Sequence, residues 1–208
     1  MPVSSNVRPR RQASPPPPTE KASVTSPKIH LFVDNSNVLI EGRRHSSMKR
    51  RGRDRPDREI DDSYEIDWGK FLYVVKSKGN RLLAQVPILY GSRPPPDDSI
   101  WQKIRDEGFD VKLFDRNIRN KEKGVDMEMG MDVVERVLTV NPPGHIVLAC
   151  GDADFLPVIS RAKKKGWNVE VWFWSNAAGN MKTEANEFCA LDKYFGYLQA
   201  GGGVALPP

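Results

Sequence analysis

A run of apolar residues with no polar position, "IVLAC" at residues 146–150, constrains the fold of this chain most. A strand with one wet face alternates apolar and polar residues, so an unbroken apolar run predicts a strand covered on both faces. Strands of this kind are typical of parallel sheets, because the crossover connections place helices on both sides of the sheet. The run therefore predicts an α/β domain.

The rest of the chain alternates strand-like and helix-like segments. Strands are predicted over 29–33, 81–91, 109–116, 144–152 and 167–174, and helices over 66–79, 98–108, 125–140, 154–166 and within 180–195. We expect an α/β fold, a three-layer α/β/α sandwich with a mostly parallel, Rossmann-like central sheet of about five strands.

The two ends of the chain differ in composition from this domain. Residues 1–27 contain "SPPPPTEKASVTSP" and few large apolar side chains, which predicts a disordered, Pro-rich tail. Residues 199–208 end in "AGGGVALPP" and predict a flexible C-terminal tail. The folded domain is expected over residues 28–198.

No apolar run approaches the length of a membrane span, and no signal-peptide core opens the chain. We expect no membrane partner and an intracellular location, in the cytoplasm or the nucleus. A mitochondrial location stays open because the N-terminal tail is basic, although its proline run disfavours the amphipathic helix of a transit peptide.

Positive charge is concentrated in "RRHSSMKRRGRDR", residues 43–55, in a chain of formal net charge +5. This stretch belongs to a predicted basic insert over residues 42–62. It is interpreted either as a solvated, disordered loop or as a phosphate-contacting arm or localisation signal. The candidate RNA-binding residues are Arg43, Arg44, Lys49, Arg50, Arg51, Arg53 and Arg55.

Acidic residues follow two of the predicted strands directly. Asp34 follows the first strand, Asp152 and Asp154 follow the fourth, and Asp126 opens the helix before the fourth strand. Functional residues of open parallel sheets lie at the carboxyl ends of the strands. If the first and fourth strands are neighbours, these carboxylates converge on one crevice, where their mutual repulsion requires a compensating cation.

Mg²⁺ or Mn²⁺ suits such a site, because both ions prefer oxygen ligands and bind substrate phosphate. The chemistry that follows is phosphodiester hydrolysis. Asn37 is a candidate for orienting a water or a phosphate, and Lys123 for contacting phosphate. Asp132 is a weaker candidate, because six residues along a helix turn it away from Asp126.

Each of these residues also has an ordinary structural interpretation. Asp34, Asp126 and Asp152 could simply cap the helices that follow them. A phosphatase of the haloacid-dehalogenase type is a further alternative, but its chemistry needs a second Asp two residues after the first. Ser36 stands at that position.

The motifs "VDNSN", "KGVDMEMGMD" and "CGDADFLPVI" resemble, in order and spacing, those of the NYN domain family, a PIN-like nuclease group. The resemblance covers about residues 28–198 and implies a metal-dependent ribonuclease. It implies an acidic Mg²⁺ site, with accompanying polar residues, at these positions: Asp34, Asp126, Asp152, Asp154, Asn37 and Asp132. The chain departs from the family pattern at Cys150, where the family has Ser, and at Asn186 in "ANEF", where the family often has Asp.

The leading hypothesis is a Mg²⁺- or Mn²⁺-dependent endonuclease that hydrolyses RNA, expected to be single-stranded. The alternative is an RNA-binding NYN module with weak or no catalysis, suggested by the basic insert and by Asn186, whose amide supplies no negative charge. The sequence leaves protein partners and homo-oligomerisation open.

Overall fold

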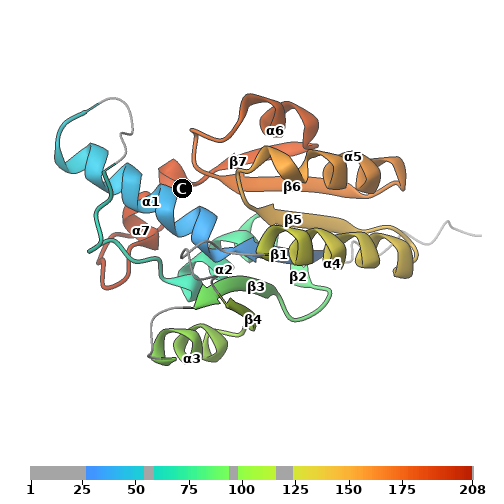
Figure 1. Cartoon of the computed structure of the whole chain (residues 1–208), viewed down its shortest axis with the longest axis horizontal. Coiled ribbons are helices and arrows are strands. Elements are labelled where there is room, and N and C mark those ends of the chain that lie inside the picture. Colours follow the sequence, from blue (N-terminus) through green and yellow to red (C-terminus); the bar gives the residue numbers. More distant parts are fainter. Residues whose placement is uncertain (1–26, 54–58, 94–97, 116–123, 208) are drawn as a thin grey trace, which may run out of the picture.

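The computed structural model describes residues 27–53, 59–93, 98–115 and 124–207 (Figure 1). The strands are β1 (Lys28–Asp34), β2 (Leu82–Leu83), β3 (Ile88–Arg93), β4 (Asp110–Asp115), β5 (His145–Ala149), β6 (Asn168–Phe173) and β7 (Glu187–Ala190). The α-helices are α1 (Asn35–Arg50), α2 (Trp68–Ser77), α3 (Ser99–Asp106), α4 (Val125–Thr139), α5 (Leu156–Lys164), α6 (Gly179–Glu184) and α7 (Phe195–Leu198). Two short 3₁₀ helices are η1 (Ala153–Phe155) and η2 (Leu191–Tyr194).

The named strands pair in parallel, in the order β4-β3-β1-β5-β6-β7, and β2 also pairs with β1. From β1 the chain builds outward to β3 and β4, then crosses back and places β5 on the other side of β1. The chain therefore reverses its direction of growth between β1 and β5. In open parallel sheets this switch point is where ligands bind.

The apolar run that predicted the fold is buried along its whole length. Each residue from Ile146 to Cys150 is fully buried. Residues 171–174, "VWFW", are buried too, and the indole nitrogen of Trp174 donates to the carbonyl oxygen of Val38 at 2.8 Å. These aromatic residues belong to the core and not to an exposed surface.

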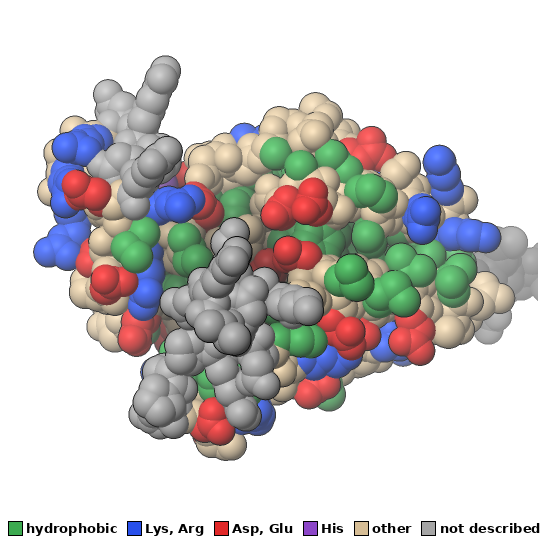
Figure 2. All heavy atoms as spheres, in the orientation of Figure 1, with side chains coloured by type: hydrophobic (Ala, Val, Ile, Leu, Met, Phe, Trp, Pro, Cys, Tyr) green, Lys and Arg blue, Asp and Glu red, His purple; other side chains and the backbone are tan. Residues whose placement is uncertain are grey.

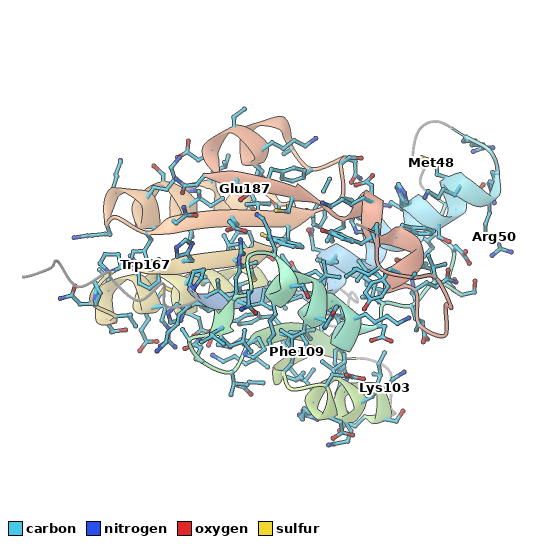
Figure 3. The ribbon with its side chains drawn as sticks, turned by 180° about the vertical axis from the view of Figure 1, so that it is seen from behind. Met48, Arg50, Lys103, Phe109, Trp167 and Glu187 are labelled. Carbon is cyan, nitrogen blue, oxygen red and sulfur yellow. The ribbon has the colours of Figure 1, made fainter. Side chains whose placement is uncertain are left out.

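Helices cover both faces of the sheet. α4 and α5 lie on the face toward the viewer in Figure 1, and α2 lies on the opposite face, seen in Figure 3. The predicted three-layer α/β/α sandwich is confirmed. In the described part of the chain, no helix combines the length and the apolar character that crossing a membrane requires.

Two predicted elements differ from the structure. The strand predicted over 81–91 is divided into β2 and β3, and Pro87, which has no N–H to donate, stands immediately before β3. The helix predicted within 180–195 is also divided, because β7 pairs with β6 between α6 and η2. The sheet therefore has seven strands where we predicted about five.

The first half of the predicted basic insert is helix and not loop. Asp34 caps α1, which runs through Arg50 and projects beyond the sheet at the end where β1 and β5 finish (Figure 1). Residues 59–63 return alongside it, where Asp61 accepts hydrogen bonds from Ser63, Ser46 and Arg50. The bonds from Ser63 and Ser46, with that from Arg50, hold the pKa of Asp61 well below its usual range.

The segment after α7 contacts α2 and the residues that lie shortly before α2 in the chain. The backbone N–H of Ala200 donates to the carbonyl oxygen of Glu65 at 2.9 Å, and the Lys70 ammonium donates to that of Gly202 at 3.0 Å. Leu206 packs against the core. The residues predicted as a flexible C-terminal tail thus make defined contacts as far as they are described.

Candidate active site

Asp34 and Asp152 stand at the carboxyl ends of the two central strands. Val33 of β1 is in register with Ala149 of β5, so the residues that follow them leave the sheet side by side. Asp34 is buried, with 3% of its surface exposed, and Asp152 is partly buried. The condition set by the sequence, that the first and fourth predicted strands are neighbours, is met, and the convergence of the carboxylates on one crevice stays a prediction.

Both aspartates also cap the turns that follow them. The Asp34 carboxylate accepts from the backbone N–H of Asn37 at 2.9 Å, and that of Asp152 from the N–H of Asp154 at 2.9 Å. The capping interpretation is thus correct for both residues. A carboxylate has two oxygens with about four lone-pair sites, so a cap does not prevent the same group from binding a cation.

Asn37 connects the two strand ends. Its side-chain oxygen accepts a hydrogen bond from the backbone N–H of Gly151, next to Asp152, at 2.8 Å. A side chain at Gly151 would collide with the ring of Phe173, so only glycine lets the chain turn here. The position of Asp152 relative to Asp34 therefore depends on the Asn37 amide.

Asp126 completes a group of three carboxylates around the end of β5. It lies in the first turn of α4, where a negative charge also favours the positive end of the helix. Burial first, and then the negative charges of Asp34, Asp152 and Asp126, raise the pKa of the Cys150 thiol well above its usual value. Three of the four predicted carboxylates therefore act electrostatically on one buried atom.

Asp154, the fourth predicted carboxylate, is exposed and faces a groove. This groove, about 500 Å³ in volume, lies between α4 and the η1–α5 segment, and Asp126 and Asp154 both line it. Figure 2 shows acidic side chains near the starts of α4 and α5 and an apolar surface that continues from them along the two helices. The acidic centre therefore opens into a groove.

The donor set fits a hard divalent cation that keeps part of its water shell. Among the described residues, no three of the four aspartates bring one oxygen each within 4.8 Å of the others. Mg²⁺ is usually held by one or two carboxylates, with water and substrate phosphate completing its coordination. The carboxylates at the ends of β1 and β5, with Asp126, match that pattern, and they carry the hard oxygen donors that Mg²⁺ and Mn²⁺ prefer.

A different group of potential ligands does lie within 4.8 Å, namely Glu170, Glu187 and Cys189. Its centre is taken by the Lys78 ammonium, which lies 3.2 Å from a Glu170 oxygen, 2.5 Å from a Glu187 oxygen and 3.2 Å from the Cys189 sulfur. Arg81 adds a bidentate pair to Glu170 at 2.9 and 2.7 Å. The side chains of Lys78 and Arg81 thus already neutralise this group, so it lacks the uncompensated charge that would favour a metal.

Asp132 belongs to a separate cluster. Its carboxylate accepts from the Lys112 ammonium at 2.6 Å and from the Tyr90 hydroxyl. Burial and then the neighbouring Asp132 raise the pKa of Tyr90. Asp132 therefore anchors α4 to β3 and β4 on the other side of the helix from Asp126, as the six-residue spacing indicated.

Asn186 lies away from the acidic centre, which agrees with the second of two possibilities that the sequence left open, a ligand position or a peripheral one. Its side-chain oxygen accepts from the backbone N–H of Val169 at 2.9 Å, and its own N–H donates to the Val169 carbonyl at 2.8 Å. Both residues stand at the amino ends of β6 and β7, whereas Asp34 and Asp152 stand at carboxyl ends. An amide here serves strand pairing, so the missing negative charge does not weaken the acidic centre.

Much of the predicted basic cluster is engaged in ion pairs. Three of its arginines pair with acids of the returning segment, as Arg43–Asp62, Arg50–Asp61 and Arg51–Glu59. Arg44 pairs with Glu41 of its own helix. The Lys49 ammonium lies 4.4 Å from the centre of the Phe195 ring. The signal for this was present in the sequence, because the acidic stretch "EIDD" follows at residues 59–62. Arg55 and Lys123 lie outside the described residues.

Sequence reasoning missed a polar group at the carboxyl ends of β6 and β7. Ser175 donates from its backbone N–H and its hydroxyl to Asp192, at 2.7 and 2.6 Å. Asn176 contacts Glu41 of α1, and His45 of α1 lies 3.7 Å from Asp192. "SN" directly after the fifth predicted strand was the available signal. These contacts hold α1 across the carboxyl ends of β6 and β7.

Comparison with known proteins agrees with this architecture. No curated protein matches the sequence. The crystal structure of a protein of unknown function from Vibrio parahaemolyticus has a TM-score of 0.61 and 21% sequence identity, over 82% of this chain and 96% of that chain, and so shares the fold. The model of the NYN domain family matches residues 28–192. That match spans most of the chain and contains all four aspartates of the candidate site, and on this evidence the chain belongs to the NYN domain family, whose fold is generally that of a nuclease.

Proposed function

We propose that this protein is an endoribonuclease that hydrolyses RNA phosphodiester bonds with Mg²⁺ or Mn²⁺. The observation that carries the proposal is the placement of Asp34 and Asp152 at the carboxyl ends of the neighbouring strands β1 and β5, at the switch point of the sheet, with Asp126 in the first turn of α4. Carboxylate oxygens are the ligands that Mg²⁺ and Mn²⁺ prefer. Membership in a family of nuclease fold supports the same chemistry.

Each residue has a distinct part in the proposed reaction. Asp34, buried and fixed by its cap, and Asp152, which follows the turn held by Asn37, would hold the cation together with Asp126 from the first turn of α4. When bound, the cation polarises a phosphoryl oxygen and lowers the pKa of a bound water. Asp154, exposed where the groove meets the acidic centre, accepts a proton from the attacking water.

The shape of the site suits a strand of RNA. The groove that begins at Asp126 and Asp154 continues along α4 and α5, and a second hollow of about 260 Å³ between the same helices extends it past Val137 to Lys165. The groove therefore gives a strand a path that leads away from the acidic centre on one side, and a circular substrate tests whether cleavage is internal.

The test uses a circular single-stranded RNA, which only an endonuclease can open, with Mg²⁺ or Mn²⁺ titrated into the purified protein. We expect metal-dependent opening by the wild type and a loss of at least about a hundredfold in Asp152→Asn and Asp34→Asn, because each substitution removes a cation ligand. Asp106→Asn, an exposed change on α3, is the matched control and should cleave as the wild type does. Unchanged cleavage in both site variants would show that the activity does not arise from this centre.

An RNA-binding module without catalysis is the second candidate. It is favoured by the exposed cations at the projecting end of α1, where the side chain of Arg50 is 68% exposed (Figure 3). It is not favoured by Asn186, which lies away from the acidic centre. Salt-dependent RNA binding by wild-type protein, without opening of the circular RNA at any metal concentration, would select this candidate.

A further inference from the structure

α4 carries a second apolar stripe that the core does not use. Val125, Met129, Val133 and Val137 are buried against the sheet. On the outer side of the helix, Met127, Met131 and Leu138 are 75%, 64% and 67% exposed. A helix at the surface of a globular protein normally has polar residues on that side. Contiguous exposed apolar patches mark interaction sites.

This outer stripe forms one wall of the groove described above. Met127, Gly130, Met131 and Val134 face Phe155, Val158 and Arg161 across it, and Leu138 lines the hollow that continues it. A Cβ at Gly130 would lie 3.6 Å from a Val158 methyl, in ordinary van der Waals contact, so the two helices are close to one another at this point of the groove. The floor and walls are therefore apolar over most of the length of the two helices.

The two ends of the groove carry opposite charge. Asp126 and Asp154 of the candidate active site lie at one end, whereas Arg161, Lys164 and Lys165 line the other. Figure 2 shows the same sequence of acidic, apolar and basic surface over α4 and α5. A strand whose scissile phosphate is at the acidic centre, bound through a cation, would bring its next phosphates toward these basic side chains.

We propose that this groove binds the single strand of RNA on one side of the scissile phosphate. The bases lie on the methionine and valine surface, and the phosphates contact Arg161 and Lys165. The nine residues of α5 span ~13 Å, enough for about four stacked nucleotides. Apolar contact with base faces predicts binding with little sequence preference. This inference rests on the proposed function, because it takes RNA as the substrate of the adjoining site.

RNA fits the groove better than a second copy of the chain or a peptide does. The groove is continuous with the carboxylates of the candidate site, so an occupant that filled it would lie against them. A polyanion with apolar bases matches the basic end and the apolar floor, and it reaches the acidic end with a phosphate that binds the same cation. The gradient of charge along the groove thus suits a strand that is bound in one direction.

The experiment measures equilibrium binding of a labelled single-stranded RNA, several times longer than the groove, to Asp152→Asn protein with Mg²⁺ present. Met131→Asp and Arg161→Ala are each added to this background. Val86→Asp and Lys103→Ala make the same kinds of change at exposed positions outside the groove and serve as the matched controls. We expect Kd to rise at least about tenfold with Met131→Asp, which puts a negative charge on the apolar wall. Arg161→Ala should weaken binding and reduce the slope of log K against log salt by about one. The controls should bind as the background does.

An unchanged Kd in both groove variants, or no RNA binding by any of the proteins, overturns the proposal. Loss of self-association in Met131→Asp by sedimentation, with RNA binding intact, overturns it as well and assigns the groove to a second copy. The outcome is separable from the nuclease test. If Met131→Asp weakens binding while wild-type protein opens no circular RNA, the groove proposal stands and the nuclease proposal fails. If wild-type protein opens circular RNA and the groove variants bind RNA as the background does, the nuclease proposal stands and the groove proposal fails.

Discussion

At the scale of single residues, the Asn37 side chain decides how the two halves of the acidic centre are held. Its oxygen accepts the hydrogen bond from the Gly151 N–H, next to Asp152 at the end of β5. Asn37 itself lies in the first turn of α1, the helix that follows the other central strand, β1. Asn37 was predicted to orient a water or a phosphate. That role stays a prediction, and the structure adds a positioning role for the side-chain oxygen, which accepts from the Gly151 N–H.

Replacing Asn37 by Ala should therefore destabilise the fold and loosen the centre together. The Gly151 N–H loses its partner, which costs about 1–3 kcal/mol when the group stays out of water. Asn37→Asp keeps an acceptor oxygen and should recover much of the loss once a divalent cation balances the added charge. Urea unfolding with and without Mg²⁺ measures both effects. An Asn37→Ala protein as stable as the wild type would show that this hydrogen bond does not hold the turn.

His30 gives the stability of the domain a dependence on pH. Burial and then the positive charge of Arg136 lower the pKa of His30 from 6.5 to about 4, against a hydrogen bond with Gln85 that raises it. Between these two values the unfolded chain binds a proton that the folded protein does not, so stability falls as the pH falls through this window.

His30→Gln should flatten this part of the stability curve, because glutamine does not titrate. The measurement is the free energy of unfolding in urea at about pH 5 and about pH 7.5, in the wild type and the variant. The wild type should lose more stability than the variant on acidification. Equal losses in the two proteins would assign the pH dependence to other groups.

At the scale of elements, β6 is tied to the end of α2 by a buried ionic group. Burial acts to raise the pKa of Glu170, but hydrogen bonds from Arg81 and Trp172 and the charges of Arg81 and Lys78 outweigh it and lower that pKa. Glu170 and Arg81 are both buried, so each depends on the other for neutralisation. These contacts join the residues that follow α2 to β6, the strand next to β5.

Glu170→Gln should be strongly destabilising, because it leaves the Arg81 guanidinium buried without a counter-charge. Removing one partner of a buried pair costs about 3–5 kcal/mol. Glu187→Gln is the matched control, since Glu187 also pairs with Lys78 but is 51% exposed, and it should change stability by less than about 1 kcal/mol. Denaturant unfolding of both variants checks the prediction, and equal effects would contradict it.

At the scale of the whole molecule, the sequence predicted the sandwich, but it left the neighbours of the first strand open and did not predict α1. The apolar strands and amphipathic helices carry strong periodic signals, whereas α1 buries His45, Ser46 and Ser47 and so has no apolar stripe. It folds because Asp34 caps it and because the carboxyl ends of β6 and β7 hold it, which are contacts distant in sequence. No local pattern could reveal them.

The candidate site was predictable in part for the same reason. Asp34 and Asp152 follow strands whose burial is readable from the sequence, and parallel sheets bring such ends together. The position of Asn186 stayed open because a short motif does not show which end of the sheet it occupies. Only the pairing of β7 with β6 places it at the amino ends. The ion pairs of the basic cluster depend likewise on a segment that returns to α1.

Metal binding should raise the stability of the entire domain, because the carboxylates come from both halves of the sheet. A cation at about a hundred times its Kd adds about 2.7 kcal/mol if it binds only the folded protein. For a chain of this size that is a rise in Tm of about 5–10 °C. Asp34→Asn should retain the cap and abolish the rise with Mn²⁺, because it removes a carboxylate ligand. A full Mn²⁺-dependent rise in Asp34→Asn would place the bound ion elsewhere.

The position of β5 between β1 and β6 has a consequence for the chain as it is made. Asp34 emerges from the ribosome with the first strand, and Asp152 follows 118 residues later (152 − 34). Until β5 inserts beside β1, the sheet has an open centre and the carboxylates have no common crevice. An unfinished or prematurely ended chain therefore contains some of the site residues but not the assembled centre. Closure of the sheet and completion of the acidic centre are the same event, so a chain that has not folded correctly has no complete centre.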